Sequence, residues 1–253
     1  MQLVALAVGP AFLVLHVFYS IDRQREPWAN VLRYCALGGL LVFAAGSLED
    51  ILIRAAGGLL ERGLLGSTLK AVVFVALVEE GCKLLPLALL GGRDRHLDEP
   101  FDWVVYSVAS ALGFAAVENL FYVADGGAGT ALARAFTAVP AHALDGTLMG
   151  YHLALASRAH GRERARRRIL ALLEPTLWHG AYDGLLFAAQ DASAAGAGAG
   201  GWIALWFALV FLQWGVCARR IAQARQLVPL RPPPVLYPLR ATHWMRRGTR
   251  TRS

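Results

Sequence analysis

The chain has 253 residues, of which 56% are hydrophobic, and its mean hydropathy is +0.44. Soluble domains average about 45–50% apolar residues, so this composition argues against a water-soluble globular protein. The net charge is +7, but the arginines gather in short segments between apolar runs, which is the pattern of membrane topology rather than of nucleic-acid binding. We therefore expect no nucleic-acid partner and a lipid bilayer as the surrounding medium.

Seven apolar runs are candidates for membrane spans, since about 20 apolar residues cross a hydrocarbon core of about 30 Å. The first run has no Lys or Arg before it and no small-residue cleavage site after it, so we expect a retained span rather than a removed signal peptide. The expected spans are, approximately, residues 2–20, 31–48, 69–90, 102–124, 131–157, 169–189 and 202–218. The sequence thus predicts an all-α fold, a multi-pass transmembrane helical bundle of about seven spans.

A short amphipathic helix is expected between the second and third spans. Ser47 can cap a helix whose first turn contains Glu49 and Asp50. Its apolar face would consist of Ile51, Leu52, Ala55 and Leu59. A helix of this kind would lie on the membrane surface.

The basic residues predict the orientation of the chain in the membrane. They follow the first, third, fifth and seventh expected spans, whereas residues 125–133 and 190–201 contain no Lys or Arg. Because basic loops remain in the cytoplasm, the N-terminus is expected outside and the C-terminus inside. The Ala-, Gly- and Arg-rich composition points to a bacterial source, so the expected location is a bacterial inner membrane. Residues 1–228 are expected to form one integral-membrane domain, and residues 229–253 a basic, Pro/Arg-rich, disordered cytoplasmic tail.

Ionisable residues occur inside four consecutive expected spans. Each costs at least about 2.5–3.5 kcal/mol at the centre of a bilayer, so each needs a partner, a watery cavity or a function. In chain order they are Glu79, Glu80 and Lys83, then Glu118 beside Asn119, then His142 and Asp145, and then Glu174, His179 and Asp183. Such residues predict a functional site, provided that they converge in space.

Glu79, Glu80 and Lys83 have the spacing of one helix face. Lys83 can neutralise one carboxylate at i,i+3 or i,i+4 while the other carboxylate faces a different direction. The unpaired, desolvated carboxylate would then suit a general base. The alternative is an ion pair that only packs helices, with a spare acid near the interface.

His179 and Asp183 are four residues apart, so the carboxylate can accept a proton from one imidazole nitrogen and orient the other toward a cavity. The alternative is a polar bridge between helices. Together with Glu118 and His142, His179 completes a three-ligand pattern that a catalytic zinc uses when its fourth position holds water. We therefore expect Glu118, His142 and His179 as candidate ligands of a divalent metal, zinc being the preferred one. His152 lies about 80° from His142 around an ideal helix and is expected to face elsewhere.

Three motifs in order resemble those of the PrsW family of intramembrane proteases. The E-E-x-x-K motif of that family is similar to Glu79-Glu80-Gly81-Cys82-Lys83, and its F-x-x-x-E-N motif to Phe114-Ala115-Ala116-Val117-Glu118-Asn119. Its H-x-x-x-D motif is similar to His179-Gly180-Ala181-Tyr182-Asp183, and His142 heads a further segment that ends in Gly150-Tyr151. The resemblance covers about residues 67–190.

The resemblance implies a membrane-embedded endopeptidase, distantly similar to CAAX prenyl proteases, that cuts a membrane-spanning protein such as an anti-sigma factor. Its expected catalytic residues are Glu79, Glu80, Lys83, Glu118, Asn119, His142, His179 and Asp183. The hypothesis is that Glu79 or Glu80 activates a water, while Glu118, His142 and His179 hold a metal or stabilise the oxyanion. Two rivals remain: a transporter or proton relay, and a scaffold in which these groups only join helices.

Overall fold

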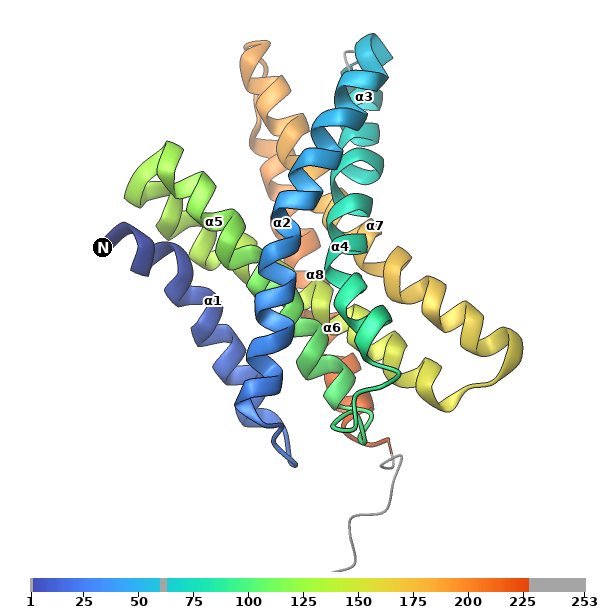
Figure 1. Ribbon diagram of the computed structural model, residues 1–253. Coiled ribbons are helices and arrows are strands. Elements are labelled where there is room, and N and C mark those ends of the chain that lie inside the picture. Colours follow the sequence, from blue (N-terminus) through green and yellow to red (C-terminus); the bar gives the residue numbers. More distant parts are fainter. Residues whose placement is uncertain (1, 60–62, 228–253) are drawn as a thin grey trace, which may run out of the picture.

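The computed structural model describes residues 2–59 and 63–227, and these residues form helices and no strand (Figure 1). The elements are α1 (Gln2–Ile21), α2 (Trp28–Ala56), the 3-10 helix η1 (Gly57–Leu59), α3 (Gly63–Leu69), the π-helix η2 (Lys70–Ala76), α4 (Leu77–Leu90), α5 (Asp102–Phe136), α6 (Ala138–Arg158), α7 (Gly161–Ala194) and α8 (Gly200–Ala224). The all-α prediction is confirmed. The expected tail, 229–253, lies outside the described residues, so the domain boundary before it stays a prediction.

Four helical stretches of the described chain are long and apolar enough to cross a membrane. They are α1, α2, the 57-residue stretch Asp102–Arg158 that contains α5 and α6, and α8. This count does not establish about seven passes, because α4 has only 14 residues and α7 begins with a run of arginines. Helices nevertheless occupy all the regions where spans were expected.

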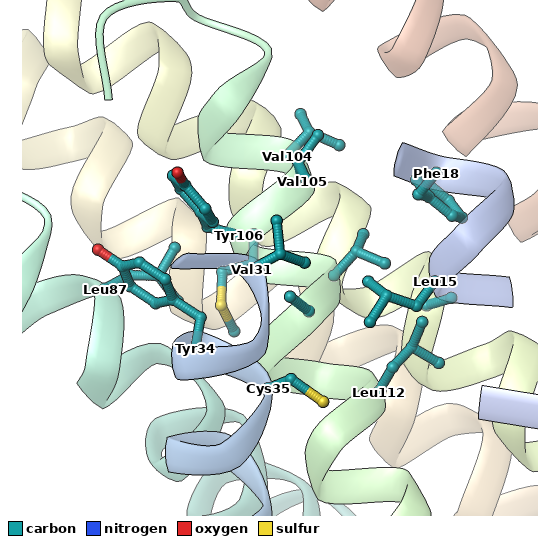
Figure 2. Packing of buried hydrophobic residues seen from close by; sticks show 14 of the residues in the cluster. Leu15, Phe18, Val31, Tyr34, Cys35, Leu87, Val104, Val105, Tyr106 and Leu112 are labelled. Atoms are coloured by element: carbon teal, nitrogen blue, oxygen red, sulfur yellow. The ribbon is translucent and has the colours of Figure 1, made fainter. Parts of the chain in front are cut away.

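Helices α5 and α6 form the centre of the bundle. In their most apolar window 78% of the residues are buried, compared with 17–22% in α1, α2 and α8. The outer helices expose large apolar side chains, among them Leu13 of α1 and Phe211 of α8, as helices in contact with lipid do. Figure 2 shows part of the core, where Leu15 of α1, Val31 of α2 and Leu112 of α5 lie close together.

Glycines let α2 and α5 pack closely. A Cβ atom on Gly113 would lie 1.8 Å from the carbonyl oxygen of Cys35, and one on Gly38 would lie 2.0 Å from that of Ser110. Membrane helices associate through small residues of this kind, because burial away from lipid supplies little driving force. The result is a rigid α2–α5 pair beside the ionisable residues of α4.

The expected surface helix after Ser47 is wrong, because α2 continues without interruption to Ala56. The Ser47 hydroxyl donates a hydrogen bond to the carbonyl oxygen of Phe43, 2.8 Å away, within the helix rather than capping a new one. An i,i+4 ion pair of 2.6 Å between Asp50 and Arg54 follows in the same helix. The helix ends before Gly57, whose φ of 50° favours glycine.

The connection between the expected fourth and fifth spans is a tight reversal instead of a loop over 125–133. Gly127 has a φ of 69° and interrupts α5, after which the chain is again helical to Phe136. The side chain of Arg134 contacts Glu118, although the two are 16 residues apart. A straight helix would separate them by about 24 Å, so the segment after Gly127 folds back. The next break, at Thr137, divides the expected span 131–157.

Candidate active site

Helix α4 places Glu79, Glu80 and Lys83 inside the bundle. The Lys83 Nζ lies 2.7 Å from Glu80 Oε1 and 3.0 Å from Glu79 Oε2, and all three side chains are buried. The expectation that Lys83 pairs with only one carboxylate is therefore wrong. A buried ammonium needs more than one acceptor to compensate for its lost hydration, and both acids are within its reach.

The two glutamates nevertheless differ in what they face. Glu79 borders a large cavity and is 6% exposed, whereas Glu80 is 0% exposed and does not border it. Glu80 Oε1 contacts both Lys83 and His179, and Glu80 Oε2 is buried without a hydrogen-bond partner. Glu79 is thus the carboxylate that can meet a molecule entering the cavity.

Helix α6 directs His142 toward the same lysine. His142 Nδ1 lies 2.9 Å from Lys83 Nζ, and His142 Nε2 lies 3.0 Å from Glu118 Oε2 of α5. Because the ammonium can only donate, these contacts assign the ring proton to Nε2, which donates to Glu118. His142 therefore joins the α4 acids to the Glu118 carboxylate.

Helix α7 brings His179 against the α4 glutamates. Its Nδ1 lies 2.8 Å from Glu80 Oε1, and its Nε2 lies 3.3 Å from Asp183 Oδ2 and 3.8 Å from Glu79 Oε2. The contact with Asp183 is the one that the i,i+4 spacing predicts. The rings of His179 and His142 are 5.5 Å apart between centroids. Both imidazoles therefore belong to one cluster.

A close contact between η2 and α7 permits this arrangement. A Cβ atom on Gly180 would lie 2.7 Å from Val72 Cγ2 and 2.8 Å from Val72 Cα of η2. A π-helix has a wider turn than an α-helix, so η2 changes the direction in which the side chains next to α4 point. Such turns are frequent at functional sites. Gly180 thus lets the segment that leads to Glu79 and Glu80 lie directly against His179.

The cluster opens onto a cavity of about 760 Å³, which is within the range of ligand sites in proteins. Side chains of α2, α4, α5, α6, α7 and α8 and of η2 line it. Its walls include Glu79, Glu118, His142, His179 and Asp183. The expected convergence of acids and imidazoles from four helices is therefore present.

In this cluster, two groups of described side chains have the geometry to hold a metal ion. One contains Glu80, His142, Asp145 and His179, and the other Glu79, Glu118 and His142; within each group one ligand atom per residue lies within 4.8 Å of the others. The expected trio of Glu118, His142 and His179 is divided between the two groups. The first group suits zinc chemically, because it has two imidazoles and two carboxylates, one of which is Glu80 with its unpartnered Oε2. Lys83 would have to give up its contact with His142.

Asn119 and Glu174 have structural partners outside the cluster. The Asn119 side-chain amide donates to the backbone oxygen of Ala7 in α1, 3.1 Å away, so Asn119 positions α5. Glu174 contacts His152, which confirms that His152 faces away from His142. Neither residue lines the cavity beside Glu79, and the catalytic role expected for Asn119 stays a prediction.

The structure adds three residues that the sequence reasoning missed. Arg134 Nη2 lies 2.8 Å from Glu118 Oε2, and its Nε donates to Asn119 Oδ1. Gln213 of α8 donates to Asp145 Oδ1 over 2.7 Å, and Glu49 of α2 lines the cavity. A buried glutamine in an apolar run was a usable signal for Gln213, whereas Arg134 depends on the reversal at Gly127 and had no local signal.

Together, the fold and the cluster define a helical membrane protein with a buried acid–base site. The chain matches the family described as PrsW family intramembrane metalloprotease over residues 26–214. It is 33% identical to Protease PrsW of Geobacillus kaustophilus, covering 92% of this chain and 97% of that protein. It is 30% identical to Protease PrsW of Bacillus subtilis, with 89% and 96% covered, and 32% identical to that of Clostridioides difficile, with 74% and 79% covered. No solved structure matches the chain.

The chain belongs to the PrsW family of intramembrane metalloproteases. It is therefore a peptidase of the membrane, and the residues just described contain the family motifs that its sequence resembles. An intramembrane protease acts on membrane proteins within the bilayer.

Proposed function

We propose that this protein is an endopeptidase that hydrolyses a peptide bond of a membrane-spanning protein in its buried cavity. The observation that carries the proposal is the convergence of Glu79, His142 and His179 on one 760 Å³ cavity inside an apolar bundle, with the buried Lys83 in contact with Glu79 and His142. A protein in which these groups only join helices would need paired charges but no cavity. A cavity bordered by acids and imidazoles provides, in addition, room for a substrate and for water.

In the proposed mechanism Glu79 acts as the general base. Its carboxylate accepts a proton from water as the water oxygen attacks the peptide carbonyl carbon, and the same proton then passes to the leaving amine. Glu80 contacts Lys83 and His179 and keeps both oriented. His179 borders the cavity, and its Nε2–H can turn from Asp183 to donate to the developing oxyanion, which is the usual source of much of the rate enhancement in acyl transfer.

A metal, if bound, would be held by His142 and His179 with Glu80 or Asp145. It would polarise the peptide carbonyl and lower the pKa of a bound water. The residues support this role because they supply nitrogen and oxygen ligands from three helices in one place. We propose zinc, since this mixed ligand set is typical of catalytic zinc sites.

The substrate that we propose is a regulatory protein with a membrane-spanning helix, such as an anti-sigma factor, as the family resemblance implies. Its helix must unwind locally, because backbone hydrogen bonds shield the peptide groups of an intact helix. We also propose that the chain crosses a bacterial inner membrane about seven times, with its N-terminus outside. The arginine-containing loops 22–27 and 91–101 and the turn between α6 and α7 lie at the same, lower end of Figure 1, which supports this orientation.

The test is cleavage of a reporter transmembrane peptide by purified protein in proteoliposomes. We expect the parent to cut the peptide and His179→Ala, if it remains folded, to lose at least about 100-fold in rate. Zinc content measured on the same samples should be stoichiometric in the parent and lost in His142→Ala. Full activity in a strong chelator would contradict the proposed metal dependence but not the proposed peptide hydrolysis.

The same experiment separates the rivals. Ion-coupled flux without cleavage would favour a transporter or proton relay, for which buried Glu, His and Asp residues are also expected. If the well-folded parent protein cuts no membrane peptide and His179→Ala only lowers stability, the result would favour the scaffold hypothesis, in which these groups only join helices.

Gly180→Ala tests the contact between η2 and α7. The added methyl group must push Val72 away, and a shift of about 1 Å between catalytic groups can cost about 100-fold in rate. We expect that loss in the reporter assay with the protein still folded. Gly184→Ala, one turn later, is the matched control, because its methyl group would meet only Ala71 Cβ at 3.7 Å. Equal activity of the two variants would show that the close contact is not needed.

A further inference from the structure

A second group of carboxylates lies around the N-terminal end of α5, away from Glu118. Asp22 follows α1, Glu99 lies in the connection between α4 and α5, and Asp102 begins α5. About 24 Å of helix separates Asp102 from Glu118, so this group is distinct from the candidate active site. None of its residues takes part in the proposed hydrolysis.

The geometry of the three carboxylates suits a hard cation. One oxygen from each of Asp22, Glu99 and Asp102 lies within 4.8 Å of the others. Oxygen ligands on opposite sides of Ca²⁺ are about 4.8 Å apart, so all three can reach one ion. Glu26, Asp98 and Asp102 form a second such group, which shares Asp102 and adds ligands or charge beside the first.

Unpartnered oxygens point to a missing ligand in this group. Asp102 is 0% exposed and Asp22 is 5% exposed, yet Asp102 Oδ1 and Asp22 Oδ2 have no hydrogen-bond partner. Buried carboxylate oxygens are normally satisfied, because leaving them without a partner costs several kcal/mol. Asp22 and Glu99 also border a cavity of about 30 Å³, which is large enough for one water molecule and is lined as well by Arg23 and Arg225.

The protein itself neutralises these acids only partly. None of the salt bridges between described residues involves Asp22, Glu99 or Asp102. A cation would relieve the repulsion among these neighbouring carboxylates and would satisfy the unpartnered oxygens of Asp22 and Asp102.

We propose that Asp22, Glu99 and Asp102 bind one divalent cation of the Mg²⁺ or Ca²⁺ type. All ligands are oxygens, which these ions prefer and zinc does not require. The bound ion joins the connection between α1 and α2 to the beginning of α5, beside the end of α8. It therefore stabilises the end of the bundle where these connections meet, independently of whether the cavity hydrolyses peptides.

Binding is measured directly with Mn²⁺ as the probe. Purified full-length protein in detergent is titrated with Mn²⁺ and followed by electron paramagnetic resonance, and Mg²⁺ and Ca²⁺ are then added as competitors. We expect one saturable Mn²⁺ equivalent that one of the two ions displaces, and the ion that displaces it at the lower concentration is the assigned ligand. The same ion should raise the midpoint of thermal unfolding, because it binds only the folded state.

Variants localise the site. Asp102→Asn and Asp22→Asn should each weaken Mn²⁺ binding at least tenfold and remove the thermal shift, and Glu99→Gln, whose side chain is only half-buried, serves if either variant fails to fold. Asp50→Asn is the matched control, since its carboxylate is exposed and paired with Arg54. Unchanged binding in Glu99→Gln and Asp102→Asn would overturn the proposal. The proposal would also be overturned if the only saturable Mn²⁺ binding by the parent protein depended on His142 and His179. The carboxylates of Asp22, Glu99 and Asp102 would then share protons instead of a cation.

Discussion

Glu79→Gln is expected to lower cleavage of the reporter peptide by about 10²–10⁴-fold while the protein remains folded. Glutamine preserves the shape of the side chain but cannot accept the proton of the attacking water, and a positioned general base contributes about that factor. Glu79 is the α4 carboxylate that borders the cavity, and it keeps only one lysine contact of 3.0 Å. Single-turnover rates on a saturating reporter peptide measure the loss, and thermal unfolding in detergent checks the fold.

Glu80→Gln and Glu49→Gln are the comparisons for this prediction. Glu80 is fully buried against Lys83 and His179, so its variant should lose thermal stability as well as rate. Glu49 lines the same cavity from α2 and has no assigned step, so its variant should keep a rate near that of the parent. Normal turnover in Glu79→Gln together with a stable, inactive Glu80→Gln would transfer the role of base to Glu80.

Lys83→Met should cause the largest loss of stability, about 3–5 kcal/mol in the free energy of unfolding. Methionine fills similar space, but it leaves Glu79 and Glu80 buried without their shared cation, and an uncompensated buried charge costs about that amount. It also removes the donor to His142 Nδ1. Unfolding in a denaturant series in mild detergent measures the difference.

The control for Lys83→Met is Lys70→Met. Lys70 is partly exposed and lies 5.2 Å above the Phe187 ring, so we expect a cost below about 1 kcal/mol. Adding Glu79→Gln and Glu80→Gln to Lys83→Met should recover much of the stability, because no unpaired charge then remains. A Lys83→Met variant as stable as the parent would mean that the two acids are already neutral in the folded protein.

Contacts within one helix could be predicted from spacing alone. The pairing of His179 with Asp183, and of Lys83 with the α4 glutamates, follows from the 3.6-residue turn, which places i,i+3 and i,i+4 side chains together. What spacing could not decide was how many partners Lys83 has. That number depends in part on α6, whose His142 comes from a distant part of the chain.

The reversal at Gly127 shows where sequence reasoning fails. A glycine-rich stretch without Lys or Arg reads as a loop, and nothing local indicates that the chain resumes a helix and returns Arg134 to Glu118. The uninterrupted α2 is a similar case. Ser47 has the residue type of a cap, but its hydroxyl bonds the preceding turn, because the helix is held by packing against α5 rather than by local preference.

The amino-acid sequence by itself determined that this protein is helical and membrane-embedded, and it predicted most of the ionisable side chains that meet at the candidate site. The bilayer makes these features predictable from sequence, because backbone groups must be hydrogen-bonded within each helix and a buried charge is too costly to occur without a role. Only the tertiary structure decided that Glu79 borders the cavity while Glu80 is enclosed, that the candidate metal ligands divide into two groups, and that Asp22, Glu99 and Asp102 meet. These outcomes depend on the close approach of helices at positions such as Gly180, and distances between helices are not encoded in the spacing along any one of them.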